Sequence, residues 1–251
     1  MADLDAALRP YVDSGAVPGL VALVSRGDDV ELAVLGSQGP DGAPMRRDSV
    51  FRGASITKPL TAALAMLLVE DGLLDLDAPV GLLMPELAEP RVLRTPTSAL
   101  DDTVACSRPI TARHLLMSTA GHGFATVESP VVPLLVERLG QSSMDVGAVP
   151  APDEWMRRLA DIPLIHQPGA QQREMGGFFL DGQGWGFGGG VDTSVRQPWN
   201  VVGRYGWVGG TGTAAYVDPQ HATVSGVLTQ IELGGPDSVG VLEAFWTAAA
   251  P

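Results

Sequence analysis

The N-terminal third of the chain shows one helical pattern followed by two extended ones. Apolar residues recur at helical spacing between Asp3 and Ser14, and Gly15 follows as a stop signal, so this segment is predicted to be a helix. The next segment, GLVALVSRGDDVELAVLG, holds two β-rich runs around residues 26–29. Such runs around a short polar turn predict an antiparallel hairpin.

A second helical stretch is apolar along most of its length. The residues TKPLTAALAMLLVED, within Ile56–Asp71, are rich in Ala, Leu and Met and are closed by Gly72, which predicts a largely buried helix with a glycine cap. The region from about 74 to 169 is dense in proline and short polar turns, which favours small helical pieces packed beside a sheet. These pieces are predicted at Thr111–Ser118, Val131–Leu139 and Asp153–Ala160.

The C-terminal part changes to glycine, aromatic and β-branched residues. The runs WGFGGGVD, GRYGWVGG, GTAAYVDP and ATVSGVLTQI predict three or four antiparallel strands, and a closing helix is predicted over about 238–249. The fold class expected is therefore α/β (α+β), with an antiparallel sheet flanked by N- and C-terminal helices and a reduced helical region. We expect a single domain over residues 1–251, with a sheet part at about 1–54 and 177–251 and a helical part at about 55–176.

Composition and charge narrow the class of protein. Hydrophobic residues make up 45% and charged residues 18% of the chain, and no apolar run reaches the roughly 18–20 residues that cross a bilayer, so neither disorder nor a membrane span is expected. The net charge of -13 disfavours binding to nucleic acid. The start, MADLDAALRP, shows no secretory signal, which predicts a cytoplasmic location unless a leader has been removed. Cys106 is the only cysteine, so no internal disulfide is expected, and its loop-like surroundings make a weak case for a catalytic thiol.

Ser55 and Lys58 are the residues that most favour a chemical role. They stand three apart at the opening of the long helix, so their side chains share one face and can reach hydrogen-bond distance. Pro59 lacks an N–H and fixes the helix start near Ser55, at the positive end of the helix, where negative charge on a substrate oxygen is stabilised. Lys58 can act as a base only if burial or a nearby positive field lowers its pKa from about 10.4.

A four-residue Ser-x-x-Lys pattern is common by chance. If the pattern stood alone, Ser55 as a helix cap and Lys58 as a solvated surface charge would be the better explanation. The sequence around it decides between the two readings. The blocks FRGASITKPLTAALAMLLVEDGLLDLDAPV, ITARHLLMSTAG, the PGA at 168–170 and GRYGWVGGTGTAAYVDP follow one another in that order.

These blocks resemble the penicillin-binding-protein-like, β-lactamase-related family, which includes class C β-lactamases, D-alanyl-D-alanine carboxypeptidases and related serine esterases. The resemblance implies acyl transfer, in which Ser55 attacks a carbonyl, Lys58 is the base, and water or another acceptor releases the acyl group. It also aligns Trp207, Val208 and Gly209 with the Lys-Thr-Gly or His-x-Gly strand motif. The N–H groups of Ser55 and Gly210 would then form the oxyanion hole.

Two departures from the family pattern bear on activity. Trp207 stands where the family has a cation, so recognition of a β-lactam or peptide carboxylate is weakened and an ester with an apolar group is favoured. The family's Tyr-x-Asn motif is missing after Pro168-Gly169, which indicates an internal deletion near Ala170–Gln171. Tyr205 is a candidate substitute, although a packed strand tyrosine is the simpler reading. The chain is then either a weakly active serine hydrolase, since losing one acid/base group costs about 10²–10⁴-fold, or a binding module without turnover.

Other chemistries have weaker support. A Ser-His-Asp triad would need a histidine base, for which His122, between two glycines, is the first candidate. No zinc-site spacing of histidines and carboxylates is present, and no metal or cofactor is expected. The expected partner is a small ester or amide substrate. Loss of part of the helical region would expose apolar surface, which predicts self-association as a homo-oligomer.

Overall fold

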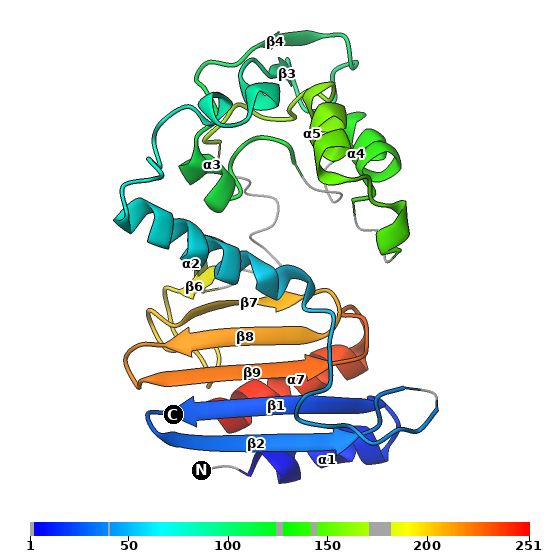
Figure 1. The fold of residues 1–251 in the computed structure, drawn as a ribbon. Coiled ribbons are helices and arrows are strands. Elements are labelled where there is room, and N and C mark those ends of the chain that lie inside the picture. Colours follow the sequence, from blue (N-terminus) through cyan, green and yellow to red (C-terminus); the bar gives the residue numbers. More distant parts are fainter. Residues whose placement is uncertain (1–2, 40, 124–127, 142–144, 171–181) are drawn as a thin grey trace. The chain divides into compact units, whose positions relative to one another are not determined.

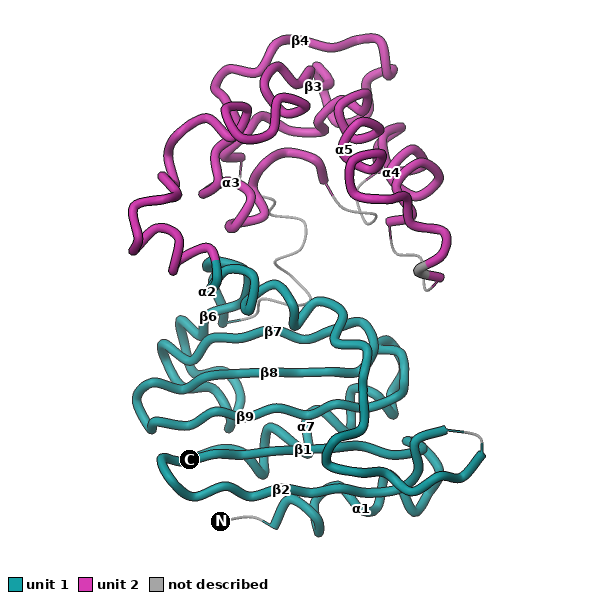
Figure 2. The backbone as a smooth tube through the Cα atoms, in the orientation of Figure 1, with its two compact units in different colours: residues 1–64, 180–251 teal, residues 65–179 magenta. Residues whose placement is uncertain are grey.

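The computed structural model describes residues 3–39, 41–123, 128–141, 145–170 and 182–251. The chain packs as two compact units, one formed by residues 1–64 with 180–251 and the other by residues 65–179 (Figure 2). The single domain expected from the sequence, with a sheet part and a helical part, stays a prediction. We describe the two units separately and call them the sheet unit and the helical unit.

The sheet unit is built on a seven-stranded antiparallel sheet whose order is β2-β1-β9-β8-β7-β6-β5 (Figure 1). The N-terminal hairpin therefore lies beside β9, and the C-terminal strands continue the sheet from there. The large antiparallel sheet with helices around it confirms the predicted fold class. The strands are β1 (Gly19–Arg26), β2 (Asp29–Gly36), β5 (Gln183–Trp185), β6 (Gly190–Asp192), β7 (Tyr205–Gly209), β8 (Thr213–Asp218) and β9 (Thr223–Thr229).

The hairpin predicted around residues 26–29 is confirmed. β1 pairs with β2 from Gly19 opposite Gly36 to Arg26 opposite Asp29, and the turn places Gly27 at a φ of 58°. Glycine adopts this left-handed conformation without the steric penalty of other residues. Residues 182–251 hold five strands instead of the three or four predicted for the C-terminal region. β5 and β6 have three residues each, too few for an alternating pattern to separate them from the surrounding glycines.

Two terminal helices cover the same face of this sheet. α1 (Leu4–Asp13) begins at Asp3, whose carboxylate accepts from the Asp5 and Ala6 amides, and α7 (Pro236–Ala249) packs against it (Figure 1). Both helices were predicted. Alternate side chains of the strands point into the core beneath the helices, as the period of two requires. The core includes Leu4, Leu8, Leu20, Ala22, Val24, Val227, Leu242 and Phe245, all at most 1% exposed.

The apolar helix predicted after Ser55 is present as α2 (Thr57–Glu70), preceded by a 3₁₀ turn over Ala54–Ile56. Gly72 follows at a φ of 69°, as expected for a glycine stop. The prediction that the helix is largely buried is wrong. Only Ala62 is buried, while Leu60 and Leu64 are 69% and 61% exposed, because apolar residues surround the whole helix circumference and neighbours cover only part of it.

Among its described residues, the helical unit shows three short helices after α2 and a small hairpin. Its helices are close to the predicted positions, and its hairpin was not predicted because it lies among proline and polar turn residues. A buried apolar cluster joins the elements, with Val92, Ile110, Val131 and Leu164 at most 2% exposed. The elements are β3 (Arg91–Leu93), β4 (Thr103–Ala105), α3 (Ala112–Leu116), α4 (Val131–Leu139) and α5 (Pro152–Ala160), with 3₁₀ turns at Val80–Leu82, Pro85–Leu87 and Val146–Ala148.

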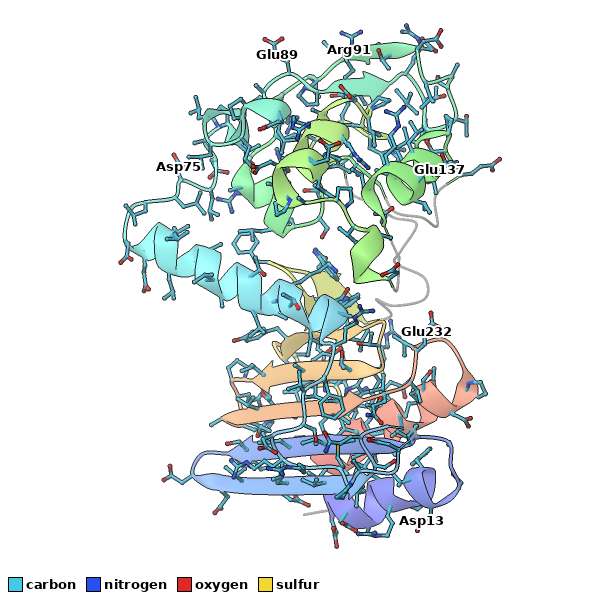
Figure 3. All side chains as sticks on the ribbon, turned by 45° about the vertical axis from the view of Figure 1, so that its right-hand side comes forward. Asp13, Asp75, Glu89, Arg91, Glu137 and Glu232 are labelled. Atoms are coloured by element: carbon cyan, nitrogen blue, oxygen red, sulfur yellow. The ribbon has the colours of Figure 1, made fainter. Side chains whose placement is uncertain are left out.

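The acidic residues behind the net charge of -13 lie largely on the surface. Figure 3 labels five of them on different elements of both units, and each is exposed: Asp13, Asp75, Glu89, Glu137 and Glu232. Because exposed carboxylates stay hydrated, they add little desolvation cost to folding.

In the part of the chain that the structure describes, no helix has the length and apolar character needed to cross a membrane.

Candidate active site

The Ser55 hydroxyl and the Lys58 amine lie within hydrogen-bond distance. Lys58 Nζ is 2.7 Å from Ser55 Oγ, with Ser55 in the 3₁₀ turn and Lys58 in the first turn of α2. Ala54, which precedes Ser55, has a φ of 48°. A residue with a side chain adopts this left-handed conformation at a cost of about 1–2 kcal/mol, so the surrounding structure must hold it in place. The backbone is therefore strained directly beside the hydroxyl.

The environment of Lys58 shifts its protonation equilibrium toward the neutral amine. Burial lowers the pKa of Lys58 below its ordinary value of 10.5. The residue as a whole stays exposed, so the desolvation concerns its ammonium end, which faces Ser55. A lower pKa raises the fraction of neutral amine at a given pH, and only the neutral amine can take the hydroxyl proton. The site can therefore activate an oxygen nucleophile.

The hairpin formed by β7 and β8 lies against the turn that carries Ser55. Thr211 Oγ1 donates to the Arg52 carbonyl at 2.5 Å, and Thr213 Oγ1 donates to the Gly53 carbonyl at 2.8 Å. Gly209 makes the approach close, since a Cβ there would overlap Thr213 Oγ1 and lie 2.5 Å from the Gly53 oxygen. The end of β7 is thus fixed beside the residues that lead into Ser55.

The turn between β5 and β6 packs against the start of α2 at Lys58. Gly188, at a φ of 72°, packs against the first turns of α2, where a Cβ would lie 2.5 Å from the Lys58 carbonyl oxygen and 2.9 Å from Ala62 Cβ. Only glycine fits this combination of backbone angle and space. The glycine-rich WGFGGG sequence therefore lets the sheet approach the helix backbone at Lys58.

The predicted binding strand coincides with β7 and the residue after it. Trp207 is 7% exposed and packs edge-on against Trp185, with ring centroids 4.5 Å apart, while Val208 packs against the core under the terminal helices. Gly210 follows at the turn, and a Cβ there would meet nothing within 4 Å. Gly210 is therefore exposed to open space at the end of the strand that is fixed beside the turn of Ser55. The Trp207 side chain offers a substrate only the small part that remains exposed.

The chain was compared with known proteins, and a family model described as Beta-lactamase matches residues 4–173. The chain belongs to the β-lactamase family. The Ser-x-x-Lys pair and the blocks up to the PGA at 168–170 lie inside the matched region, whereas GRYGWVGGTGTAAYVDP lies beyond it. The match confirms the family expected from the sequence.

Curated proteins with similar sequences include one that is named as an esterase. Protein Rv1367c of Mycobacterium tuberculosis is 37% identical over 168 residues, which cover 65% of this chain and 40% of that protein. Esterase EstB of Burkholderia gladioli is 36% identical over 175 residues, which cover 67% of this chain and 40% of the esterase. The chain thus spans less than half the length of these relatives.

A solved structure of the hydrolase EstCE1, described as having promiscuous acyltransferase activity, has a similar fold. The TM-score is 0.73 at 19% identity, and the superposition covers 97% of each chain. At this identity the likeness concerns the fold. The antiparallel sheet with its terminal helices is therefore an arrangement that this β-lactamase-family chain shares with a hydrolase.

All three tyrosines of this β-lactamase-family chain lie in the sheet unit, and none contacts the Ser55–Lys58 pair in the contacts described. Tyr11 packs beside Gly240 of α7, and Tyr216 lies in the core beneath the terminal helices, where burial raises its pKa to about 12. Tyr205 is 44% exposed at the start of β7, four residues or about 13 Å along an extended strand from Gly209. The role of Tyr205 as a substitute acid/base group stays a prediction. The missing Tyr-x-Asn motif and the deletion inferred at 170–171 adjoin residues 171–181, which lie outside the described residues.

A buried ionic network that the sequence did not reveal holds the start of β7. Asp192 of β6 is fully buried and accepts from Arg204 Nε at 2.9 Å, from the Val201 amide at 3.1 Å and from Gln183 Nε2 at 2.5 Å. Arg204 also stacks over the Tyr216 ring, 4.4 Å from its centroid. The pattern of apolar and polar residues could not predict this ion pair, because Asp192 and Arg204 come together only when β6 and β7 are adjacent in the sheet.

His122, the candidate base of a triad, lies in the helical unit between Gly121 and Gly123. Burial lowers its pKa to about 4, so it is neutral at neutral pH. The Ser55–Lys58 pair belongs to the sheet unit, and the role of His122 in catalysis stays a prediction. Lys58 is the residue that the structure places against the Ser55 hydroxyl.

The helical unit has an open cavity of about 450 Å³ beside Cys106. Neither Ser55 nor Lys58 lines it. Burial raises the pKa of Cys106, which keeps the thiol protonated and disfavours it as a nucleophile. Within the described ranges, no group of three or more His, Cys, Asp or Glu side chains is arranged to hold a metal ion.

Proposed function

We propose that this chain is a serine hydrolase that acts on esters or amides through an acyl-enzyme on Ser55, with Lys58 as the base. The observation that carries the proposal is the 2.7 Å hydrogen bond between Lys58 Nζ and Ser55 Oγ, together with the burial that lowers the pKa of the amine. The same amine on a solvated surface would stay protonated at neutral pH.

In the acylation step, neutral Lys58 takes the proton from Ser55 Oγ as this oxygen attacks the carbonyl carbon of the substrate. The carbon–leaving-group bond then breaks, and its electron pair leaves with the departing oxygen or nitrogen, which takes the proton from the Lys58 ammonium. The N–H groups of Ser55 and Gly210 are proposed to stabilise the negative carbonyl oxygen between these events. Open space at Gly210 supports this role.

In the second half of the reaction, Lys58 takes a proton from water, and the hydroxide formed attacks the acyl-serine carbonyl. The Ser55 oxygen leaves and recovers its proton from Lys58, so the enzyme returns to its starting state. An alcohol in place of water would give acyl transfer. This route uses one proton carrier for every step, which is consistent with slow turnover.

We further propose that esters are favoured over β-lactams. Trp207 stands where the family's strand motif carries a cation, so a substrate carboxylate has no such partner at that position. Esters also need less assistance than amides, because an alkoxide or phenolate is a better leaving group than an amine anion. The esterase EstB among the curated relatives agrees with this preference.

Intact-mass spectrometry tests the proposal most directly. The wild type, Ser55→Ala and Lys58→Met are incubated with p-nitrophenyl butyrate, a fluorophosphonate and a penicillin, and the mass of each product is measured. We expect a single adduct on the wild type with the first two reagents, none on Ser55→Ala, and slower labelling of Lys58→Met. An adduct that persists on Ser55→Ala would remove the nucleophile assignment.

The second candidate function is a binding module without turnover. The observation that favours it is that, among the contacts described, no tyrosine side chain reaches Ser55 or Lys58, which leaves the pair without the family's usual acid/base partner. No adduct on the wild type with any reagent would favour this alternative. An unchanged esterase rate in Tyr205→Phe would separately exclude tyrosine as an acid/base group.

A further inference from the structure

Two threonine hydroxyls join the strand hairpin to the turn that carries the proposed nucleophile. Thr211 and Thr213 donate to the carbonyl oxygens of Arg52 and Gly53, two successive residues just before Ala54 and Ser55. Thr213 begins β8, and it lies opposite Gly209 in the β7–β8 register. The partners are about 160 residues apart in sequence, so the contact is tertiary.

We infer that Thr213, assisted by Thr211, is a positioning residue that fixes Ser55 relative to the Gly210 amide. This inference rests on the proposed function, in which Ser55 attacks and Gly210 stabilises the oxyanion. Gly210 directly precedes Thr211 in the hairpin, whereas Ser55 follows Gly53 by two residues. The two hydroxyl–carbonyl bonds therefore connect the backbone of the oxyanion donor to the backbone of the nucleophile.

The backbone before Ser55 needs such support. Ala54 has a φ of 48°, a conformation that a residue with a Cβ leaves readily unless its neighbours are held. The Gly53 carbonyl on one side of Ala54 is fixed by Thr213, and on the other side α2 begins at Thr57, directly after the turn that holds Ser55. Without the threonine bond, the strained residue could relax, and the Ser55 hydroxyl would move with it.

The threonine side chain is placed where water cannot replace it. Thr213 is fully buried, and the glycine opposite it leaves no space between β7 and the turn, since a Cβ at Gly209 would overlap the Thr213 hydroxyl. A valine at 213 has nearly the same shape but donates no hydrogen bond, so it would leave the Gly53 carbonyl without this donor. A serine at 213 keeps the donor.

Three variants test the inference by kinetics: Thr213→Val, Thr213→Ser and, as a matched control, Thr223→Val. Thr223 is also buried in the sheet and donates from Oγ1 to a turn carbonyl, that of His221 at 3.1 Å, but it pairs with Asp218 at the other end of β8. Second-order labelling by a fluorophosphonate and kcat and KM for p-nitrophenyl butyrate are measured for each.

We expect Thr213→Val to lower labelling and kcat by about 10–100-fold with KM changed less than threefold, because small misplacement of reacting atoms costs this much. Thr213→Ser should recover most of the rate, and Thr223→Val should match the wild type. Equal rates in Thr213→Val and the wild type would overturn the inference. So would equal losses in Thr213→Val and Thr223→Val, because they would indicate general destabilisation.

A second measurement does not depend on activity. Hydrogen exchange of a peptide covering residues 50–58 is followed by mass spectrometry in the same variants. We expect faster exchange in Thr213→Val and unchanged exchange in Thr223→Val. If the wild type is not labelled at Ser55, the proposed function fails, while faster exchange in Thr213→Val would still show that the threonine holds the turn. Unchanged exchange in Thr213→Val would overturn the positioning role itself.

Discussion

Lys58 Nζ and Ser55 Oγ lie 2.7 Å apart across one helical turn, and the amine is partly desolvated at that point. The relationship is local, because residues three apart on a helix share a face. Its consequence is chemical: desolvation raises the fraction of neutral amine at a given pH, and a neutral amine in contact with a hydroxyl can accept its proton.

The acylation rate should depend on the protonation of Lys58. Because burial lowers the pKa of Lys58 below 10.5, the rate should rise with pH and reach its plateau with a midpoint below that value. The measurement is single-turnover release of p-nitrophenolate between pH 6 and 11, corrected with Ser55→Ala. Lys58→Arg stays protonated over this range and should lose about 10²–10⁴-fold. A midpoint at or above 10.5 would contradict the role of burial.

Gly209→Ala should damage the site without unfolding the sheet. The added Cβ would lie 2.5 Å from the Gly53 oxygen, so strand and turn must separate, and labelling should fall by about 10–100-fold. Gly226→Ala is the matched control in β9, where the new Cβ would lie 3.6 Å from the Ala214 oxygen, an ordinary contact. The labelling rates of both variants are compared with the wild type. Full activity in Gly209→Ala would mean that the close approach is not required.

The buried pair of Asp192 and Arg204 should be essential for stability. Asp192→Asn leaves the Arg204 guanidinium buried without its counter-charge, and breaking a buried pair in this way costs about 3–5 kcal/mol. Urea denaturation followed by tryptophan fluorescence measures the change in unfolding free energy. Asp48→Asn, which removes an exposed pair with Arg46, is the control and should leave the midpoint unchanged. Similar midpoints for the two variants would contradict the importance of burial.

His122 should make stability depend on pH between about 6.5 and 4. Burial lowers its pKa to about 4, so in this window the unfolded chain binds a proton that the folded chain does not. The contribution is therefore complete above pH 6.5 and is lost as pH falls through 4. It amounts to at most about 3 kcal/mol, less to the extent that solvent reaches the ring.

The test compares unfolding free energies of the wild type and His122→Asn at pH 7 and pH 4.5. The variant should lose less stability than the wild type on acidification, because it lacks the buried imidazole. The quantity compared is the change in unfolding free energy between pH 7 and pH 4.5 within each protein. This change excludes the cost of the substitution at pH 7. Identical acid sensitivity in the two proteins would show that His122 is not the group responsible.

Much of the secondary structure was predictable from local sequence. The segment from Asp3 to Ser14 and the hairpin around residues 26–29 were recognised from their periods and turn residues, and both form at the expected places. The small hairpin of β3 and β4 was missed, since its three-residue strands are too short to show a period. The exposure of α2 was also misjudged, because composition indicates how apolar a helix is and not which neighbours cover it.

The sequence by itself determined the pairing of Ser55 with Lys58, because a spacing of three residues at a helix start fixes that geometry within one turn of the chain. Tertiary structure decided what surrounds the pair. The Thr213 bond to the Gly53 carbonyl, the burial of Trp207 under Trp185 and the ion pair of Asp192 with Arg204 each depend on which strands become neighbours in the sheet. Such contacts have no local signature, because they arise only when distant segments pack against one another.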